Sequence, residues 1–140
     1  MIRNIVRSLL LVFAAGAAGG LANALAVAGA GESGLLAFLK SDIAQDLTRQ
    51  MIYMRMVWGG IWGAAFLLPD ILRVWPVRNG ILNGILLGLL PSAVVLFYLM
   101  PAGPAGFMGL EKGLAVPFLV VAFNAVWGVT GMILYRFARS

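Results

Sequence analysis

Residues 79–100 read NGILNGILLGLLPSAVVLFYLM, and this stretch contains no charged side chain. A helix rises about 1.5 Å per residue, so the stretch is long enough to cross the roughly 30 Å hydrocarbon core of a bilayer. Pro91 lies inside it, and we expect a kink there, which neighbouring helices can accommodate. The stretch therefore predicts a transmembrane helix.

Three further apolar runs have similar length and lie at residues 5–29, 51–69 and 114–135. Across the chain 62% of residues are hydrophobic and only 11% are charged, against about 25% charged residues in average soluble domains. A signal peptide needs an apolar core of only about 7–15 residues, so we expect the first run to be an uncleaved span. The sequence predicts an all-α integral membrane four-helix bundle that forms a single transmembrane domain over residues 1–140.

Residues 33–49 differ from the spans because polar and apolar side chains alternate along them. Leu35, Leu39, Ile43 and Leu47 recur every four residues, with charged residues between them. This periodicity is typical of an amphipathic helix. We predict a helix on the membrane surface between the first two spans.

The basic residues indicate the orientation of the bundle. With the N-terminus inside, six of the ten Lys and Arg residues fall on the cytoplasmic side, namely Arg3, Arg7, Arg73, Arg78, Arg136 and Arg139. The other four are Lys40, Arg49, Arg55 and Lys112. Since cytoplasmic loops carry an excess of Lys and Arg, we expect both termini to be cytoplasmic.

Composition removes several classes of function. The chain has no Cys and no His, so we expect no metal site, no cofactor and no catalytic residues, and we predict that the protein is not an enzyme. The basic residues flank apolar runs, which favours the bilayer rather than nucleic acid as the partner. No Asp or Glu lies within a span, which argues against proton coupling and favours a neutral or anionic solute if one is carried.

Small residues recur at intervals of four within three spans. These positions are Gly16, Gly20, Gly59, Gly63, Gly80, Gly84, Gly88 and Ser92. Such rows let helix backbones approach closely in a membrane. They predict helix packing, either within one chain or between copies in a homo-oligomer.

Four polar residues within spans are candidates for an intramembrane network or a polar pathway: Asn23, Arg55, Asn124 and Thr130. Arg55 lies about one turn inside its span, so it could snorkel to the surface, pair with Asp46 or Glu111, or contact an anion. Antiparallel first and second spans would place Asn23 and Arg55 at similar depth, and we expect a hydrogen bond between them. Structural contacts between helices are the alternative for the asparagines.

A short pattern occurs twice, as Arg55-Met-Val-Trp-Gly59 and as Asn124-Ala-Val-Trp-Gly128. Two hairpins related as parallel repeats would produce such a pattern. Five positions match easily by coincidence, and coincidence is our interpretation from the sequence.

The stretch Gly19-Gly-Leu-Ala-Asn23 and residues 55–69, RMVWGGIWGAAFLLP, resemble a group of small uncharacterised bacterial inner-membrane proteins with four predicted transmembrane helices. The resemblance implies a bacterial cytoplasmic membrane and brings no activity with it. Fluoride channels and small multidrug transporters have a similar size, but their signature residues are absent from this chain.

Two functions fit these features, and from the sequence we predict the first, with the second as the alternative. The first is an accessory or scaffold subunit of a membrane complex, whose partners are the lipid bilayer and other membrane subunits. The second is a homo-oligomeric channel or facilitator for a small neutral or anionic solute.

Overall fold

The computed structural model describes residues 1–72 and 74–140, and this part of the chain is helical without strands. Among these residues, four helices are long and apolar enough to cross a membrane, which agrees with the predicted number of spans. Their segments are α1 (Ile2–Glu32); α3 (Arg49–Trp62) with η1 (Gly63–Leu67) and α4 (Leu68–Ile71); α5 (Gly80–Val94) with the π-helical turn η2 (Val95–Leu99); and α6 (Val116–Arg139). Arg73, which we assigned to the cytoplasmic side, lies outside the described residues.

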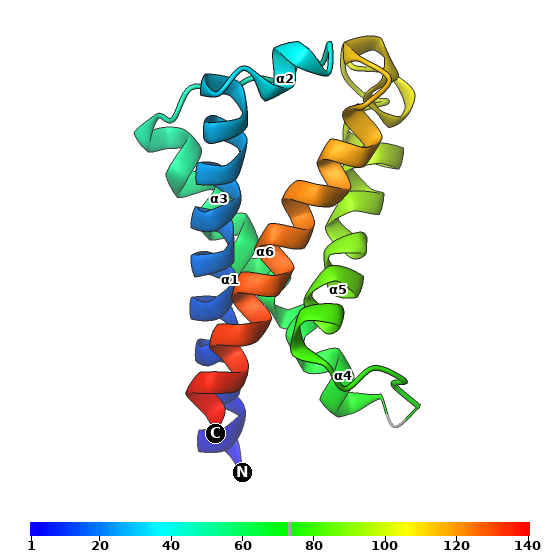
Figure 1. The fold of residues 1–140 in the computed structure, drawn as a ribbon. Helices are drawn as coiled ribbons and strands as arrows, with labels where there is room; N and C mark the ends of the chain where they lie inside the picture. Colours follow the sequence, from blue (N-terminus) through cyan, green and yellow to red (C-terminus); the bar gives the residue numbers. More distant parts are fainter. Residues whose placement is uncertain (73) are drawn as a thin grey trace.

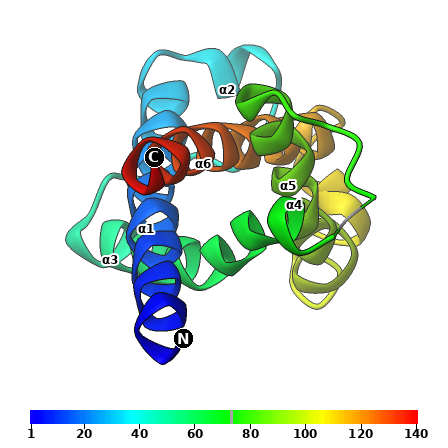
Figure 2. The ribbon, with the colours of Figure 1, turned by 90° about the horizontal axis from the view of Figure 1, so that it is seen from below.

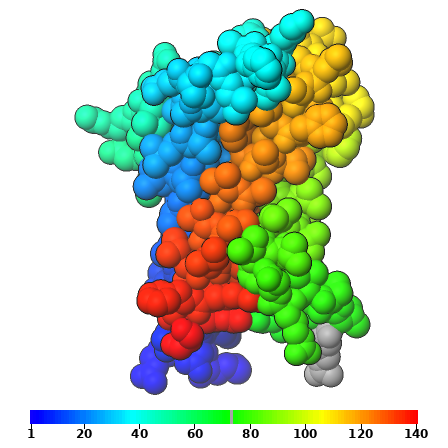
Figure 3. All heavy atoms as spheres, viewed as in Figure 1, coloured from blue at the N-terminus to red at the C-terminus, as the bar shows by residue number. Residues whose placement is uncertain are grey.

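The helices form a V that opens at the top of Figure 1. One arm contains α1 and α3, and the other contains α5, while α6 runs diagonally from the top of the second arm to the foot of the first. Seen from below in Figure 2, α6 lies between α1 and α5, and it packs against both. We call α1 with α3 the first hairpin and α5 with α6 the second hairpin. Both termini lie at the same end of the bundle, at the bottom of Figures 1 and 3.

Polar caps define where two of the spans begin. The Thr48 hydroxyl accepts a hydrogen bond from the Met51 amide at 3.1 Å, at the start of α3. The Asn79 side chain accepts from the amides of Ile81 and Leu82 at the start of α5. Both side chains satisfy amide groups that have no partner in the first helical turn.

Glycine allows the helices of each hairpin to cross in contact. A Cβ atom on Gly20 would overlap the carbonyl oxygen of Arg55, and one on Gly84 would overlap the backbone at Gly128 and Val129. Only glycine leaves room for these backbone contacts, which are the usual means of helix association in lipid. The rows of small residues therefore determine where α1 crosses α3 and where α5 crosses α6.

Trp127 of α6 fills the centre of the molecule, where the two hairpins meet. It is buried and stacks on Phe66 of η1 with the ring centroids 5.0 Å apart. Its indole Nε1 donates to the carbonyl oxygens of Gly16 and Gly59, each at 3.2 Å. A side chain of the second hairpin is thus hydrogen-bonded to both helices of the first hairpin at the point where they cross.

The continuous surface helix that we predicted over residues 33–49 does not form. Between α1 and α3 only α2 (Leu35–Phe38) is helical, and residues 41–48 have no regular structure. Lys40 has a φ of 54°, which ends the turn, and the Asp42 amide then donates to the Lys112 carbonyl at 2.8 Å instead of to a helical neighbour. Long-range backbone pairing has replaced the helix that the four-residue periodicity favoured.

Candidate functional site

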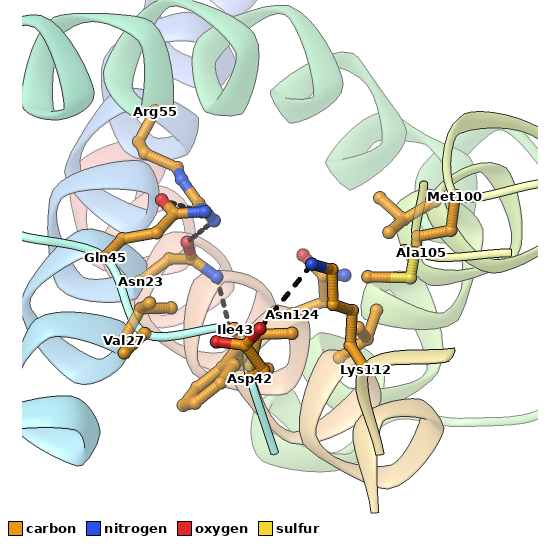
Figure 4. Close-up of a pocket in the computed structure, with 14 residues that line it drawn as sticks. Asn23, Val27, Asp42, Ile43, Gln45, Arg55, Met100, Ala105, Lys112 and Asn124 are labelled. Atoms are coloured by element: carbon orange, nitrogen blue, oxygen red, sulfur yellow. Dashed lines mark hydrogen bonds and ion pairs between the residues drawn. The ribbon is translucent and has the colours of Figure 1, made fainter. Parts of the chain in front are cut away.

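A cavity of about 460 Å³ lies beside the loops at the end of the bundle opposite the termini, at the top of Figure 1. Both hairpins contribute to its wall, together with the loops at residues 42–45 and 105–112. Its volume lies in the range of small-molecule sites, about 300–1,000 Å³. Figure 4 shows polar side chains from α1, α3, α6 and both loops turned toward this space.

Arg55 is one of two cations that line this cavity, and it comes from α3. Its Nη1 donates to Oδ1 of Asn23 at 2.7 Å, and its Nη2 donates to Oε1 of Gln45 at 3.0 Å. The hydrogen bond between Arg55 and Asn23 that we expected from their depths is thereby confirmed. Neither Asp46 nor Glu111 pairs with Arg55 in the described part of the chain, so the predicted alternative of an ion pair is wrong.

Both hydrogen bonds of the Arg55 guanidinium therefore go to neutral oxygen atoms, which do not neutralise its positive charge. A guanidinium group has more N–H donors than these two hydrogen bonds use. The remaining donors can bind an anion at the cavity wall.

Asn23 fixes the position of Arg55 because its own side chain is held on both sides. It is 4% exposed, and its Nδ2 donates to the carbonyl oxygen of Phe123 in α6 at 2.8 Å. The amide therefore presents Oδ1 to Arg55. Asn23 joins α1, α3 and α6 at the depth of the cavity.

Asn124 lines the cavity from the second hairpin. Its Nδ2 donates to Oγ of Ser92 at 3.0 Å, and the Ser92 hydroxyl donates to the carbonyl oxygen of Gly88 at 2.7 Å. Within the described residues, Oδ1 of Asn124 has no hydrogen-bond partner. This oxygen can accept a hydrogen bond from a ligand.

Asp42 and Lys112 both line the cavity and form an ion pair, with Oδ2 and Nζ 3.6 Å apart. The Asp42 side chain is 88% exposed, so solvent screens this contact. Two cations and one carboxylate line the cavity, which leaves an excess of one positive charge. Sequence reasoning missed this pair and Gln45, because they meet through folding of loops and not through any local motif.

Thr130 does not belong to this group. It lies on α6 beyond Trp127 and is not part of the cavity wall. Trp127 and the crossing of Gly16 with Gly59 lie between the cavity and the end of the bundle that carries the termini. The expected pathway through Asn23, Arg55, Asn124 and Thr130 thus includes three residues of one cavity and a fourth residue elsewhere.

The small residues singled out in the sequence face neighbouring helices of the same chain. Gly16 and Gly20 meet α3 near Gly59, Gly63 and Arg55, while Gly84 and Gly88 meet α6. Gly80 lies beside the Arg136 side chain. Ser92 contributes a hydrogen bond to Asn124 in place of a close backbone contact.

A second polar cluster lies at the opposite end of the bundle and was not predicted. Asp70 pairs with Arg139, and the Tyr135 hydroxyl donates to Oδ2 of Asp70 at 3.3 Å. It ties the end of α4 to the last turn of α6. Its exposure and its position beside the termini make it a structural contact and not part of the cavity.

The cavity combines a fixed cation, a free amide oxygen and an apolar lining, which suits binding of a small polar or anionic molecule. In the described part of the chain, no group of three or more Asp and Glu residues could hold a metal ion. No protein-family model, curated protein or solved structure matches this chain.

Proposed function

We propose that this protein is a facilitator for a small neutral or anionic solute in the bacterial cytoplasmic membrane. The observation that carries the proposal is Arg55, a half-buried cation in the cavity whose hydrogen-bond partners are neutral. An ionisable side chain inside a span is costly, and where it faces a cavity it marks a site for substrate or ion.

Electrostatics favours an anion over a cation at this site. Arg55 carries a positive charge, because a guanidinium group stays protonated in proteins. Asn23 and Gln45 orient the guanidinium without neutralising it. A bound carboxylate or similar anion would supply the missing charge and form bidentate hydrogen bonds.

The proposed orientation places both termini in the cytoplasm and the cavity in the outer half of the membrane. The basic residues near the termini support it, because Lys and Arg are retained on the cytoplasmic side. Solute would enter from outside and reach Arg55, with Trp127 closing the path below. Passage then requires the two hairpins to tilt against each other around Trp127, as repeats do in alternating access.

An accessory role in a membrane complex is the second candidate. It is favoured by two exposed aromatic side chains on α3, since Tyr53 is 60% exposed and Trp58 is 57% exposed. The rows of small residues support it less than the sequence suggested, because they face helices within the chain. The cavity is likewise formed within one chain, so a homo-oligomer is not needed to build it.

Flux into proteoliposomes tests the proposed function. Purified protein is reconstituted, and uptake of radiolabelled acetate is compared between wild type, Arg55→Gln and Arg49→Gln. Arg49 lies on the same helix and does not line the cavity, so it controls for loss of positive charge. We expect uptake in wild type and Arg49→Gln, and uptake at the level of protein-free liposomes in Arg55→Gln.

Two results would contradict the facilitator. The first is wild-type uptake no faster than in protein-free liposomes across a series of small carboxylates, chloride and glycerol. The second is equal uptake by wild type and Arg55→Gln. Mild-detergent purification that yields stoichiometric partner subunits in place of flux would support the accessory role.

A further inference from the structure

The two hairpins repeat the same backbone contacts. A Cβ atom on Gly59 would overlap the carbonyl oxygen of Gly16, and a Cβ atom on Gly128 would overlap that of Gly84. The pattern extends one turn along each crossing. There, Gly20 lies against the carbonyl oxygen of Arg55, and Gly88 lies against the carbonyl oxygen of Asn124.

A sequence offset of 68 residues for the first helix of each hairpin, and of 69 for the second helix, relates these contacts. Gly84 and Gly88 follow Gly16 and Gly20 by 68 residues, and Asn124 and Gly128 follow Arg55 and Gly59 by 69. Val27 and Val95, again 68 residues apart, both line the cavity. The shared polar-x-Val-Trp-Gly pattern falls in this register, which removes the basis for treating it as coincidence.

Each hairpin also contains one polar pair that joins its two helices. Asn23 bonds to Arg55, and Ser92 bonds to Asn124, and the partners are separated by 32 residues in both cases. The offset of 68 residues between the glycines relates Asn23 to Pro91, and Ser92 is the next residue in the chain. A serine there restores a hydrogen-bonding side chain next to a proline that lacks one.

The repeats run in the same direction. Both α1 and α5 run from the end with the termini toward the cavity, and α3 and α6 run back (Figure 1). This is the arrangement of parallel repeats related by an axis along the membrane normal, which place their solute sites at the interface between the repeats. The cavity lies at that interface, and the first hairpin provides Arg55 while the second provides Asn124.

From this correspondence we infer that the cavity is a site of two halves, and that its solute is a small carboxylate with a second group that donates a hydrogen bond, such as a hydroxyl. The inference rests on the proposed function and adds the role of Asn124. Arg55 binds the carboxylate. The free Oδ1 of Asn124 accepts from the hydroxyl, while Ser92 holds the Asn124 amide in place.

Paired ligands test this division of roles. Isothermal titration calorimetry on the purified protein in mild detergent compares unbranched carboxylates from acetate to hexanoate with their ω-hydroxy counterparts. We expect one chain length at which the hydroxy acid binds about five-fold more tightly than its parent acid, the gain from one neutral hydrogen bond. Asn124→Ala should abolish this preference, so that the hydroxy acid and its parent acid bind equally. Thr130→Ala, on the same helix but outside the cavity, should retain the wild-type preference.

The binding measurements distinguish the loss of the second half-site from the loss of the proposed function. If parent acids bind and Arg55→Gln removes their binding, but no hydroxy acid is preferred at any chain length, the second half-site is overturned and the facilitator stands. A preference that survives in folded Asn124→Ala also overturns it. If wild type binds no carboxylate at all, the proposed function fails and this inference fails with it. The wild-type series alone decides the question should Asn124→Ala fail to fold.

Discussion

Asn23 accepts a hydrogen bond from Arg55 at 2.7 Å while it donates one to the carbonyl oxygen of Phe123 at 2.8 Å. Three helices that are distant in sequence are joined at this single amide. The only charge within the spanning part of α3 is thereby fixed at the wall of a cavity. Asn23 thus links the packing of the helices to the proposed role of Arg55.

Replacing Asn23 should affect stability and solute binding together. Asn23→Ala removes both hydrogen bonds, and polar contacts between membrane helices contribute about 0.6 kcal/mol each on average. We expect a loss of about 1 kcal/mol in unfolding free energy, and weaker carboxylate binding because Arg55 is no longer oriented. Denaturant titration and calorimetry measure the two effects. Asn4→Ala, at an exposed position of the same helix, is the control and should change neither.

The close crossing of α1 and α3 should not tolerate a methyl group at Gly20. In Gly20→Ala the new Cβ atom meets the carbonyl oxygen of Arg55, and overpacking of this kind costs about 1–3 kcal/mol. Gly29→Ala makes the same change on the same helix where nothing lies within 4 Å. We expect a lower Tm for Gly20→Ala and an equal or higher Tm for Gly29→Ala. Equal destabilisation of both variants would show that the crossing is looser than described.

Trp127 should stabilise the junction of the hairpins through its indole nitrogen as well as its ring. Trp127→Phe keeps an aromatic ring against Phe66 but leaves the carbonyl oxygens of Gly16 and Gly59 without that donor. We expect a loss of about 1 kcal/mol in unfolding free energy, measured by denaturant titration in mixed micelles. Trp58→Phe, at an exposed position on α3, should be neutral within error.

The ion pair of Asp70 and Arg139 should contribute little and should depend on salt. Both side chains are about 40% exposed, and such pairs contribute less than about 1 kcal/mol. A double-mutant cycle with Asp70→Asn and Arg139→Gln gives the coupling energy, which high salt should reduce. A coupling energy well above this value, or one insensitive to salt, would contradict a solvent-exposed contact.

The spans were predictable because their signal is local. Residues 79–100 contain no charged side chain, and residues 80–99 form α5 with η2. The contact of Asn23 with Arg55 was also predictable, since antiparallel neighbours place residues at equal depth. Both inferences need only the rise of a helix and the thickness of a bilayer.

The loops and the second half of the cavity could not be predicted in this way. Residues 41–48 have helical periodicity, but the Asp42 backbone pairs with Lys112, and such a distant partner leaves no local signal. Asn124 is one polar residue in an apolar run, and its contact with Ser92 depends on the register of two helices. Thr130 was grouped with the cavity residues by its polarity alone. It lies beyond Trp127 on α6 and does not line the cavity.

The proposed function requires a water-filled cavity around Arg55 that opens at the end of the bundle away from the termini. The chain has no Cys, so single cysteines at Val95, which lines the cavity, and at Val94, its exposed neighbour on the lipid side, are specific probes. A membrane-impermeant maleimide applied from outside to intact cells should label Val95→Cys, and an added carboxylate should slow that reaction. Val94→Cys should stay unlabelled, because its thiol lies in hydrocarbon at the same depth. Equal labelling of the two cysteines, or no labelling of Val95→Cys, would contradict the account.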